Sequence, residues 1–286
     1  MSATYKAIEV TKPGVFTEVD RPLREPGFNE VRILVEACGV CHTDSMLVNA
    51  EIPNLTYPRV PGHEIIGRID AIGSNVTTRS VGQRVGVGIC GGWDDTCLSC
   101  LRGDFVNCAN AVLTGIMIDG GYAEVMIIEA RATVTIPDGL EPVKAAPLLC
   151  AGVTTYNALR NAALRAGALV AVQGVGGLGH LGIQYARRMG FKTVAINRGP
   201  ELEKLARELG AHQYQRRGTC GSEAAGTWRS GRRPRHRPER QGNVRPHQRA
   251  RRPGKTAGHW ARAGPDRSKN RFPRLWHAFH LWVGHR

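Results

Sequence analysis

The stretch that decides the fold reads Leu169-Val170-Ala171-Val172-Gln173-Gly174-Val175-Gly176-Gly177-Leu178-Gly179. A short apolar run ends at a group of glycines, and a helical pattern continues from there to Arg188. A second strand pattern over 193–196 leads into a helical pattern over 201–209. This alternation of strand and helix predicts the start of a parallel α/β sheet.

The glycines of this stretch have the spacing of a dinucleotide-binding turn. The first permits a tight turn, the second lets the backbone approach a pyrophosphate, and the third lets helix and strand pack closely. Because the motif follows a strand and opens a helix, we expect a nucleotide at the helix N-terminus. A glycine-rich turn without a ligand is the alternative. The expected contacts are Gly174, Gly176, Gly177, Leu178 and Gly179.

The residues after the second strand bear on the choice of cofactor. An acidic side chain there would hold the ribose hydroxyls of NAD. This chain has Asn197 followed by Arg198, so no carboxylate is present and a guanidinium is available for a 2′-phosphate. The pair therefore favours NADP over NAD, and the alternative is that Arg198 is a solvated loop charge.

Residues 1 to about 150 have a different character and predict a β-rich domain. Short apolar runs at 31–35 and 124–128 are bounded by turn residues, and glycines recur at high density. We expect a compact, irregular barrel. Between 143 and 164 the chain becomes rich in Ala and Leu, as helices are.

The last quarter of the chain is a polycation. Residues 216–286 hold 17 Arg and 2 Lys against 3 acidic residues, a net charge of +16, whereas 1–215 has a net charge of −1. No strand or helix period persists there except a short apolar patch near 275–283. Such a segment cannot bury enough apolar surface to offset its ordering entropy, so we expect a largely disordered basic tail.

Two further interpretations of 216–286 follow from its composition. Arg, Pro, Gly and His dominate, as they do when a GC-rich gene is read out of frame, so one hypothesis is a frameshift product. Resequencing of the gene tests it. The other is a nucleic-acid-binding tail, because polycations bind phosphate backbones. The tail lacks a recognisable recognition module, so we expect at most non-specific binding.

The eight cysteines indicate metal binding in a reducing compartment. The N-terminus has no apolar signal region, so we expect a cytoplasmic protein with reduced thiols. The uncharged stretch 166–186 is long enough to span a bilayer, but its glycines and polar residues favour a buried strand, turn and helix. No membrane association is expected.

An open metal site is predicted from Cys41, His63 and Cys150. Thiolate and imidazole are ligands that zinc prefers, and a sparse ligand set leaves a position for water or substrate. Any one of these residues alone is more often a buried core residue than a metal ligand. Their neighbours add weight, because Thr43 offers a hydroxyl near the thiolate and Asp44 could orient the imidazole of His63.

A second metal site is predicted from Cys97-x2-Cys100-x7-Cys108. Three thiolates at this spacing resemble three corners of a structural zinc tetrahedron. The residue at the same interval before Cys97 is Asp94, which can bind zinc through oxygen, and Cys90 is the alternative fourth ligand. Three free thiols in a surface loop remain the competing interpretation.

Five motifs in this order resemble the zinc-dependent alcohol dehydrogenases of the medium-chain dehydrogenase/reductase superfamily. They are Gly-Val-Cys-His-Thr-Asp at 39–44, Gly-His-Glu at 62–64, the cysteine lobe at 97–108, Pro-Leu-Leu-Cys-Ala-Gly-Val-Thr-Thr-Tyr at 147–156 and the glycines at 174–179. The resemblance runs from about residue 5 to about 215. It implies an α/β protein with a GroES-like catalytic domain at 1–150 and a truncated Rossmann domain at 151–215.

The resemblance also implies roles for single residues. Catalytic zinc would sit on Cys41, His63 and Cys150 with Glu64 as an occasional ligand, and Thr43 would bind the substrate hydroxyl and relay its proton. His42 would lie at the cofactor. The implied reaction interconverts a small alcohol and an aldehyde or ketone with NAD(P), and the resemblance implies a homo-oligomer for intact relatives. A zinc-free quinone-type reductase of the same superfamily is an alternative that the zinc ligands argue against.

The resemblance stops after Leu209-Gly210-Ala211-His212. A full dinucleotide site needs both halves of the Rossmann fold, and 216–286 lacks the pattern of the second half. The sequence therefore also raises the expectation of an inactive form.

Overall fold

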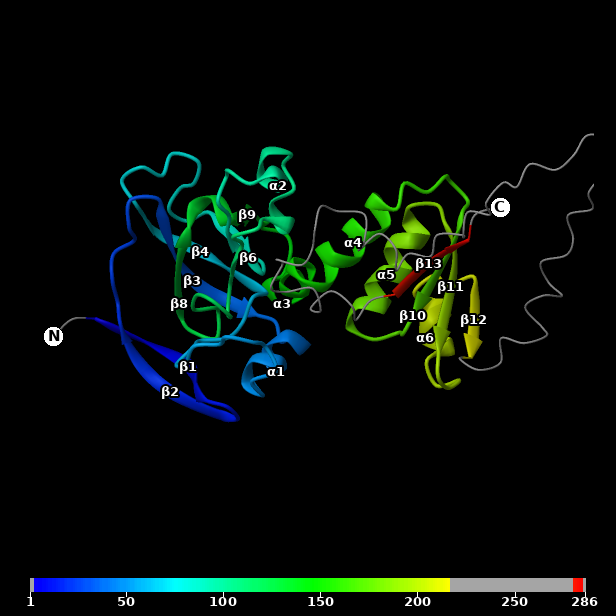
Figure 1. Ribbon diagram of the computed structural model, residues 1–286, viewed down its shortest axis with the longest axis horizontal. Coiled ribbons are helices and arrows are strands. Elements are labelled where there is room, and N and C mark those ends of the chain that lie inside the picture. The colour runs from blue at the N-terminus through cyan, green and yellow to red at the C-terminus, as the bar shows by residue number, and fades with distance from the viewer. Residues whose placement is uncertain (1–2, 217–279, 285–286) are drawn as a thin grey trace, which may run out of the picture. The chain divides into compact units, whose positions relative to one another are not determined.

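The computed structural model describes residues 3–216 and 280–284 of the chain (Figure 1). The chain divides into two compact units, Met1–Thr154 and Thr155–Arg286, which are described separately below. Within the described residues, no helix has the length and apolar character needed to cross a membrane.

The first unit is built on a five-stranded antiparallel sheet in the order β8-β3-β4-β5-β9. Every second side chain of its strands points inward, so Val31, Ile33, Ile65 and Ile69 are fully buried. The strands expected around 31–35 and 124–128 are confirmed. Their bounds are β3 (Glu30–Cys38), β4 (Ile65–Ile72), β5 (Arg84–Val87), β8 (Val125–Glu129) and β9 (Thr133–Thr135).

Two small antiparallel pairs and several short helices complete this unit. The strand pairs are β1 (Thr4–Lys12) with β2 (Val15–Pro22), and β6 (Cys90–Gly92) with β7 (Val112–Leu113). The α-helices are α1 (His42–Val48), α2 (Leu98–Leu101) and α3 (Pro142–Ala145). The 3₁₀ turns are η1 (Phe105–Asn107), η2 (Ala130–Ala132) and η3 (Ala146–Leu149).

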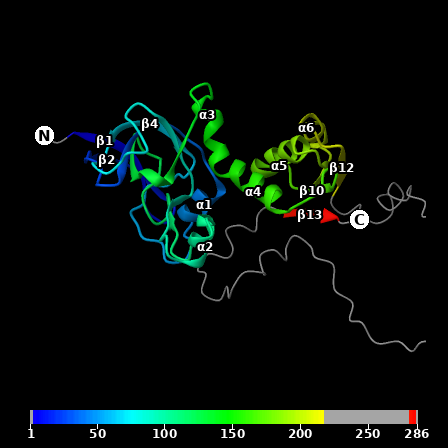
Figure 2. The same cartoon turned by 90° about the horizontal axis from the view of Figure 1, so that it is seen from above.

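The second unit contains the predicted parallel sheet. Strands β10 (Leu169–Gln173), β11 (Lys192–Asn197) and β12 (Gln213–Arg216) run parallel, and β13 (His280–Gly284) pairs antiparallel with β10. Helix α5 (Gly177–Arg188) follows β10, and α6 (Glu203–Glu208) follows β11. Both helices lie on the same side of the sheet (Figure 2). Helix α4 (Ala151–Asn161) leads into this unit.

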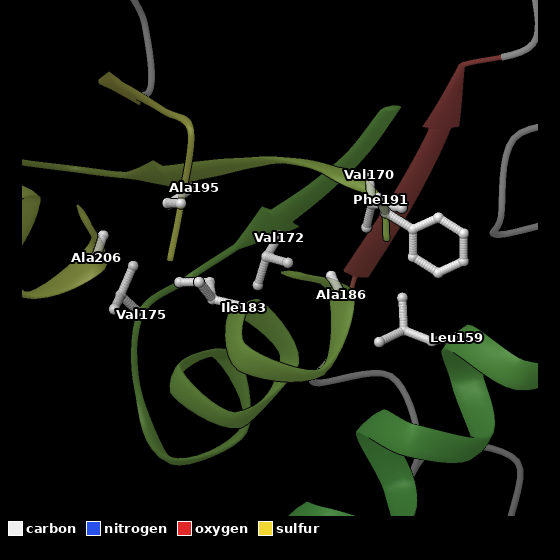
Figure 3. Packing of buried hydrophobic residues seen from close by; sticks show 10 residues of the cluster. Leu159, Val170, Val172, Val175, Ile183, Ala186, Phe191, Ala195 and Ala206 are labelled. Atoms are coloured by element: carbon white, nitrogen blue, oxygen red, sulfur yellow. The ribbon is translucent and has the colours of Figure 1, made fainter. Parts of the chain in front are cut away.

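The core of the second unit forms where α5 packs on β10. Ile183 and Ala186 of α5 face Val170 and Val172, and Phe191 closes the end of this cluster (Figure 3). All of these side chains are at most 6% exposed. This burial follows from the period of 3.6 in the helix against the continuous apolar run of the strand.

The structure differs from the expected basic tail at two places. Arg216 ends β12, and 280–284 forms β13 inside the segment predicted to lack structure. The unpaired edge of β10 offers backbone donors and acceptors, and the sequence His-Leu-Trp-Val-Gly has the composition of a strand. The predictions made for 217–279 and 285–286, including the frameshift and nucleic-acid binding, lie outside the described residues, as does Cys220.

Candidate functional site

Helix α1 fixes the first predicted ligand, Cys41. Cys41 is the N-cap of α1, and Asp44 lies in the first turn of this helix. The backbone N–H of Cys41 donates to Oδ2 of Asp44 at 2.9 Å, which is the reciprocal half of a capping box. A carboxylate at the helix N-terminus is also favoured by the helix dipole. The backbone that carries the Cys41 thiol is therefore anchored by Asp44.

Asp44 also fixes the second predicted ligand, His63. The backbone N–H of Gly62 donates to Oδ1 of Asp44 at 3.1 Å, and Nδ1 of His63 lies 3.2 Å from the same oxygen. Asp44 is only 5% exposed, so these interactions are shielded from water. Asp44 thus lies next to the imidazole of His63, and its role in orienting the ring stays a prediction.

Close packing explains why glycine precedes His63. Gly62 has φ +98°, and a Cβ there would lie 2.6 Å from the Tyr122 ring and 2.7 Å from Sγ of Cys38. A side chain at this position would therefore force the segment away from Tyr122 and Cys38. Cys38 packs against the sheet core.

The third predicted ligand, Cys150, directly follows η3. A Cβ at Gly88 would lie 2.9 Å from the carbonyl oxygen of Leu149, so β5 and η3 meet through a glycine. Sγ of Cys150 lies 3.7 Å from Sγ of Cys41.

Four potential ligands converge at this point of the first unit. The ligand atoms of Cys41, His63, Glu64 and Cys150 all lie within 4.8 Å of one another. His63 is fully buried, and its Nε2 atom makes no hydrogen bond. A buried polar nitrogen without a partner costs free energy unless a ligand satisfies it. Two sulfurs, one imidazole nitrogen and one carboxylate fit a zinc ion.

The ionisation of this cluster reflects its concentrated negative charge. The contact with Cys150 lowers the pKa of Cys41 to about 4, and the same contact raises the pKa of Cys150. Burial lowers the pKa of His63, but Asp44 and Cys41 outweigh burial and raise it to about 9. Burial raises the pKa of Glu64 to about 7. Protons bound to these groups thus offset the negative charge of the cluster. A divalent cation would offset the same charge in their place.

Thr43 and His42 are in the first turn of α1, directly after Cys41. Oγ1 of Thr43 is 3.7 Å from Sγ of Cys41, which places the hydroxyl next to the thiolate. His42 is exposed on the surface of its own unit. The roles of these two residues remain predictions.

The second predicted metal site also converges. The ligand atoms of Asp94, Cys97, Cys100 and Cys108 lie within 4.8 Å of one another. Backbone N–H groups of Cys97 and Thr96 donate to Oδ1 of Asp94 at 3.0 and 2.9 Å. These bonds hold the pKa of Asp94 below its usual value, and Oδ2 of Asp94 accepts a further hydrogen bond from the Asn110 side chain at 2.7 Å.

Asp94 rather than Cys90 joins this cluster, and the two candidates can be separated by mutation. We expect Asp94→Ala to weaken zinc binding in the lobe by at least about 100-fold, because it removes a direct ligand. Cys90→Ala should leave the zinc content unchanged. Chelator competition followed by metal analysis measures both variants. Loss of lobe zinc in Cys90→Ala but not in Asp94→Ala would reverse this assignment.

The glycines of the second unit divide into two structural classes. Gly174 has φ +88°, and a Cβ on Gly179 would lie 1.7 Å from the carbonyl oxygen of Gly174. These two glycines are required by the turn and by helix packing. At Gly176 and Gly177 a Cβ would meet nothing within 4 Å. Open space over these two positions fits a backbone that a ligand approaches, and Leu178 follows in the first turn of α5.

Asn197 and Arg198 lie at the carboxyl end of β11. Asn197 is half-buried and Arg198 is exposed, and both lie at the edge where parallel sheets bind nucleotides. This placement fits both the 2′-phosphate and the solvated-charge interpretation.

Sequence reasoning missed two residues that support the first cluster, Tyr122 and Asp119. Tyr122 donates to Asp44 at 3.2 Å, and Asp119 accepts from the backbone of Val60 at 3.1 Å. These contacts join residues 78 and 59 positions apart in the chain. No spacing rule connects such distant residues, although the sequence Asp-Gly-Gly-Tyr does mark a tight segment.

Comparison with known proteins gives a consistent result. Residues 27–138 match the alcohol dehydrogenase GroES-like domain. The alcohol dehydrogenase notN of Aspergillus sp. is 50% identical over 212 residues, which cover 74% of this chain and 62% of the relative. The chain thus spans less than two thirds of the length of the curated relatives that it matches first.

Solved structures agree with the sequence relatives. A D-arabinose dehydrogenase from Sulfolobus solfataricus is 31% identical with a TM-score of 0.67, over 75% of this chain and 67% of that one. A cobalt- and zinc-bound thermostable alcohol dehydrogenase from Pyrobaculum aerophilum is 28% identical with a TM-score of 0.70, over 75% and 66%. The chain belongs to the zinc-dependent alcohol dehydrogenases of the medium-chain dehydrogenase/reductase superfamily.

Proposed function

We propose that the chain is a zinc-dependent oxidoreductase that interconverts a small alcohol and an aldehyde or ketone with NAD(P). The observation that carries the proposal is the convergence of Cys41, His63 and Cys150 around an imidazole nitrogen without a partner. Residues 1–150 would form the catalytic domain and 151–215 the first half of the nucleotide-binding domain.

Cys41, His63 and Cys150 would hold the catalytic zinc, and Glu64 lies within reach as an occasional ligand. When bound, zinc supplies a Lewis acid that lowers the pKa of an alcohol hydroxyl. Thr43 would take up the hydroxyl proton and relay it to water, and NAD(P), when bound, would supply the acceptor for the hydride of the alcohol carbon. Asp44, whose Oδ1 lies 3.2 Å from Nδ1 of His63, would keep the ring in the tautomer that leaves Nε2 for the metal.

The cofactor would be held by the second unit. Gly174, Gly176, Gly177 and Gly179 would bring the backbone to the pyrophosphate, at the N-terminus of α5. We favour NADP over NAD, because Arg198 is exposed after β11 and Asn197 provides no carboxylate for the ribose.

A second, structural zinc would be held by Asp94, Cys97, Cys100 and Cys108. Seven free cysteines among the described residues fit a reducing compartment, so we place the protein in the cytoplasm. The proposal includes the homo-oligomer that the family resemblance implies. Neither alternative is favoured, because a zinc-free reductase does not need the Cys41 cluster and the nucleic-acid hypothesis concerns residues outside the described ranges.

Metal analysis and a hydride-transfer assay test the proposal together. We expect two zinc ions per chain, one for each cluster. A panel of primary alcohols and aldehydes is offered with NAD(H) and with NADP(H), and absorbance of the reduced nicotinamide is followed. Zinc binding with turnover supports the whole proposal. Zinc binding without turnover would identify a metal-holding chain that is inactive, and absence of zinc at the Cys41 cluster would refute the assignment.

A further inference from the structure

The segment that carries His63 is held by a third segment, residues 119–122. Four successive residues of this segment form hydrogen bonds with residues 59–62. The carboxylate of Asp119 accepts from the backbone N–H of Val60, and three backbone N–H groups donate to carbonyl oxygens. These donors are Gly120 to Val60 at 2.7 Å, Gly121 to Gly62 at 3.1 Å and Tyr122 to Pro61 at 3.0 Å.

Glycine at two positions lets these segments touch. A Cβ at Gly120 would lie 2.0 Å from the carbonyl oxygen of Gly62, and a Cβ at Gly121 would lie 2.3 Å from Cγ1 of Ile65. Atoms at such distances cannot coexist, so the path of the 119–122 segment is set by its contact with the His63 segment. These contacts therefore hold Tyr122 beside Gly62.

The side chain of Tyr122 completes the contacts of Asp44. Its hydroxyl donates to Oδ2 of Asp44 at 3.2 Å, and its ring packs on Gly62. The same Oδ2 accepts from Cys41 N–H, while Oδ1 contacts Gly62 N–H and His63 Nδ1. Each carboxylate oxygen thus has two partners, and each partner comes from a segment that holds or supports a ligand.

We propose that Tyr122 is a positioning residue of the Cys41–His63 metal centre and acts through Asp44. With the hydroxyl present, the buried carboxylate is held on both oxygens, so the Cys41 backbone and the His63 ring keep one relative placement. Without it, one lone pair of a buried carboxylate loses its donor and the carboxylate can rotate. This inference rests on the proposed metal function of the cluster.

The test compares Tyr122→Phe with a matched control, Tyr57→Phe. Both tyrosines are half-buried in the first unit, but the Tyr57 hydroxyl donates to the carbonyl of Leu47 at 2.7 Å and does not contact Asp44. Zinc release is titrated with a chelator in the full chain. We expect Tyr122→Phe to lower the zinc affinity of the Cys41–His63 centre about tenfold. Loss of a residue that supports a metal ligand typically has an effect of this size. The lobe zinc should be unaffected, and Tyr57→Phe should leave both ions unchanged.

A second measurement separates positioning from general destabilisation. In an Asp44→Asn background, the additional effect of Tyr122→Phe on zinc affinity should fall to about onefold, because the two residues act in one chain of contacts. Unchanged zinc release in Tyr122→Phe would overturn the inference, as would equal weakening of both zinc ions or full additivity with Asp44→Asn. If the unmutated chain holds no zinc at the Cys41 cluster, the proposed function itself fails, and this inference fails with it.

Discussion

Cys41→Ser is expected to reduce the zinc content from two ions per chain to one. A serine hydroxyl does not ionise near neutral pH, so the substitution removes one of two thiolate ligands. The remaining ligands, His63, Glu64 and Cys150, then include a single sulfur. Hydride transfer, where the unmutated chain shows it, should fall to background, since the Lewis acid is lost. Metal analysis after gel filtration gives the zinc count.

Cys38→Ser is the matched control for this experiment. Cys38 lies three residues before Cys41, but its thiol packs against the sheet core and is not among the four clustered ligands. Burial raises the pKa of Cys38 to about 12, which keeps it as a neutral thiol. This variant should retain two zinc ions although it loses some stability. Retention of two ions in Cys41→Ser, or loss of one in Cys38→Ser, would contradict the assignment of the metal centre.

The local patterns in the sequence predicted much of the fold, because they reflect local chemistry. The run at 169–173 was expected as a strand and a helix was expected to follow the glycines as far as Arg188; β10 spans Leu169–Gln173 and α5 spans Gly177–Arg188. The lobe ligand Asp94 was expected from the interval before Cys97. In each case a short stretch contains its own physical explanation, such as a φ value, a helix cap or a ligand interval.

The support of the metal centre could not be predicted in the same way. Tyr122 reaches Asp44 only because β3 and β4 bring α1 and the His63 segment together and the glycines at 120 and 121 allow close contact. The pairing of β13 with β10 is likewise long-range, joining 280–284 to 169–173. An alternating pattern shows which residues face a core, but not which distant segment lies opposite them.

Gly179→Ala is expected to destabilise the second unit by about 3 kcal/mol, at the upper end of overpacking effects. The added methyl group would lie 1.7 Å from the carbonyl oxygen of Gly174. This oxygen belongs to a tight turn in which Gly174 has φ +88°. The Gly174 N–H donates to the carbonyl oxygen of Ile196 in β11 at 2.8 Å, so the turn cannot move away from the methyl group without breaking this hydrogen bond. Urea unfolding followed by circular dichroism measures the change.

Gly177→Ala makes the same chemical change two residues earlier in α5, where a Cβ meets nothing within 4 Å. Alanine stabilises a helix relative to glycine. The free energy of unfolding of this variant should therefore equal that of the unmutated chain or exceed it by up to about 1 kcal/mol. Its cost should instead appear in nucleotide affinity, because the methyl group would fill space that a pyrophosphate needs. The zinc content of the first unit should be the same in both variants. Equal stability of the two variants would show that helix α5 does not require glycine at 179, and undiminished NAD(P) binding by Gly177→Ala would show that the open space over this turn is not the phosphate site.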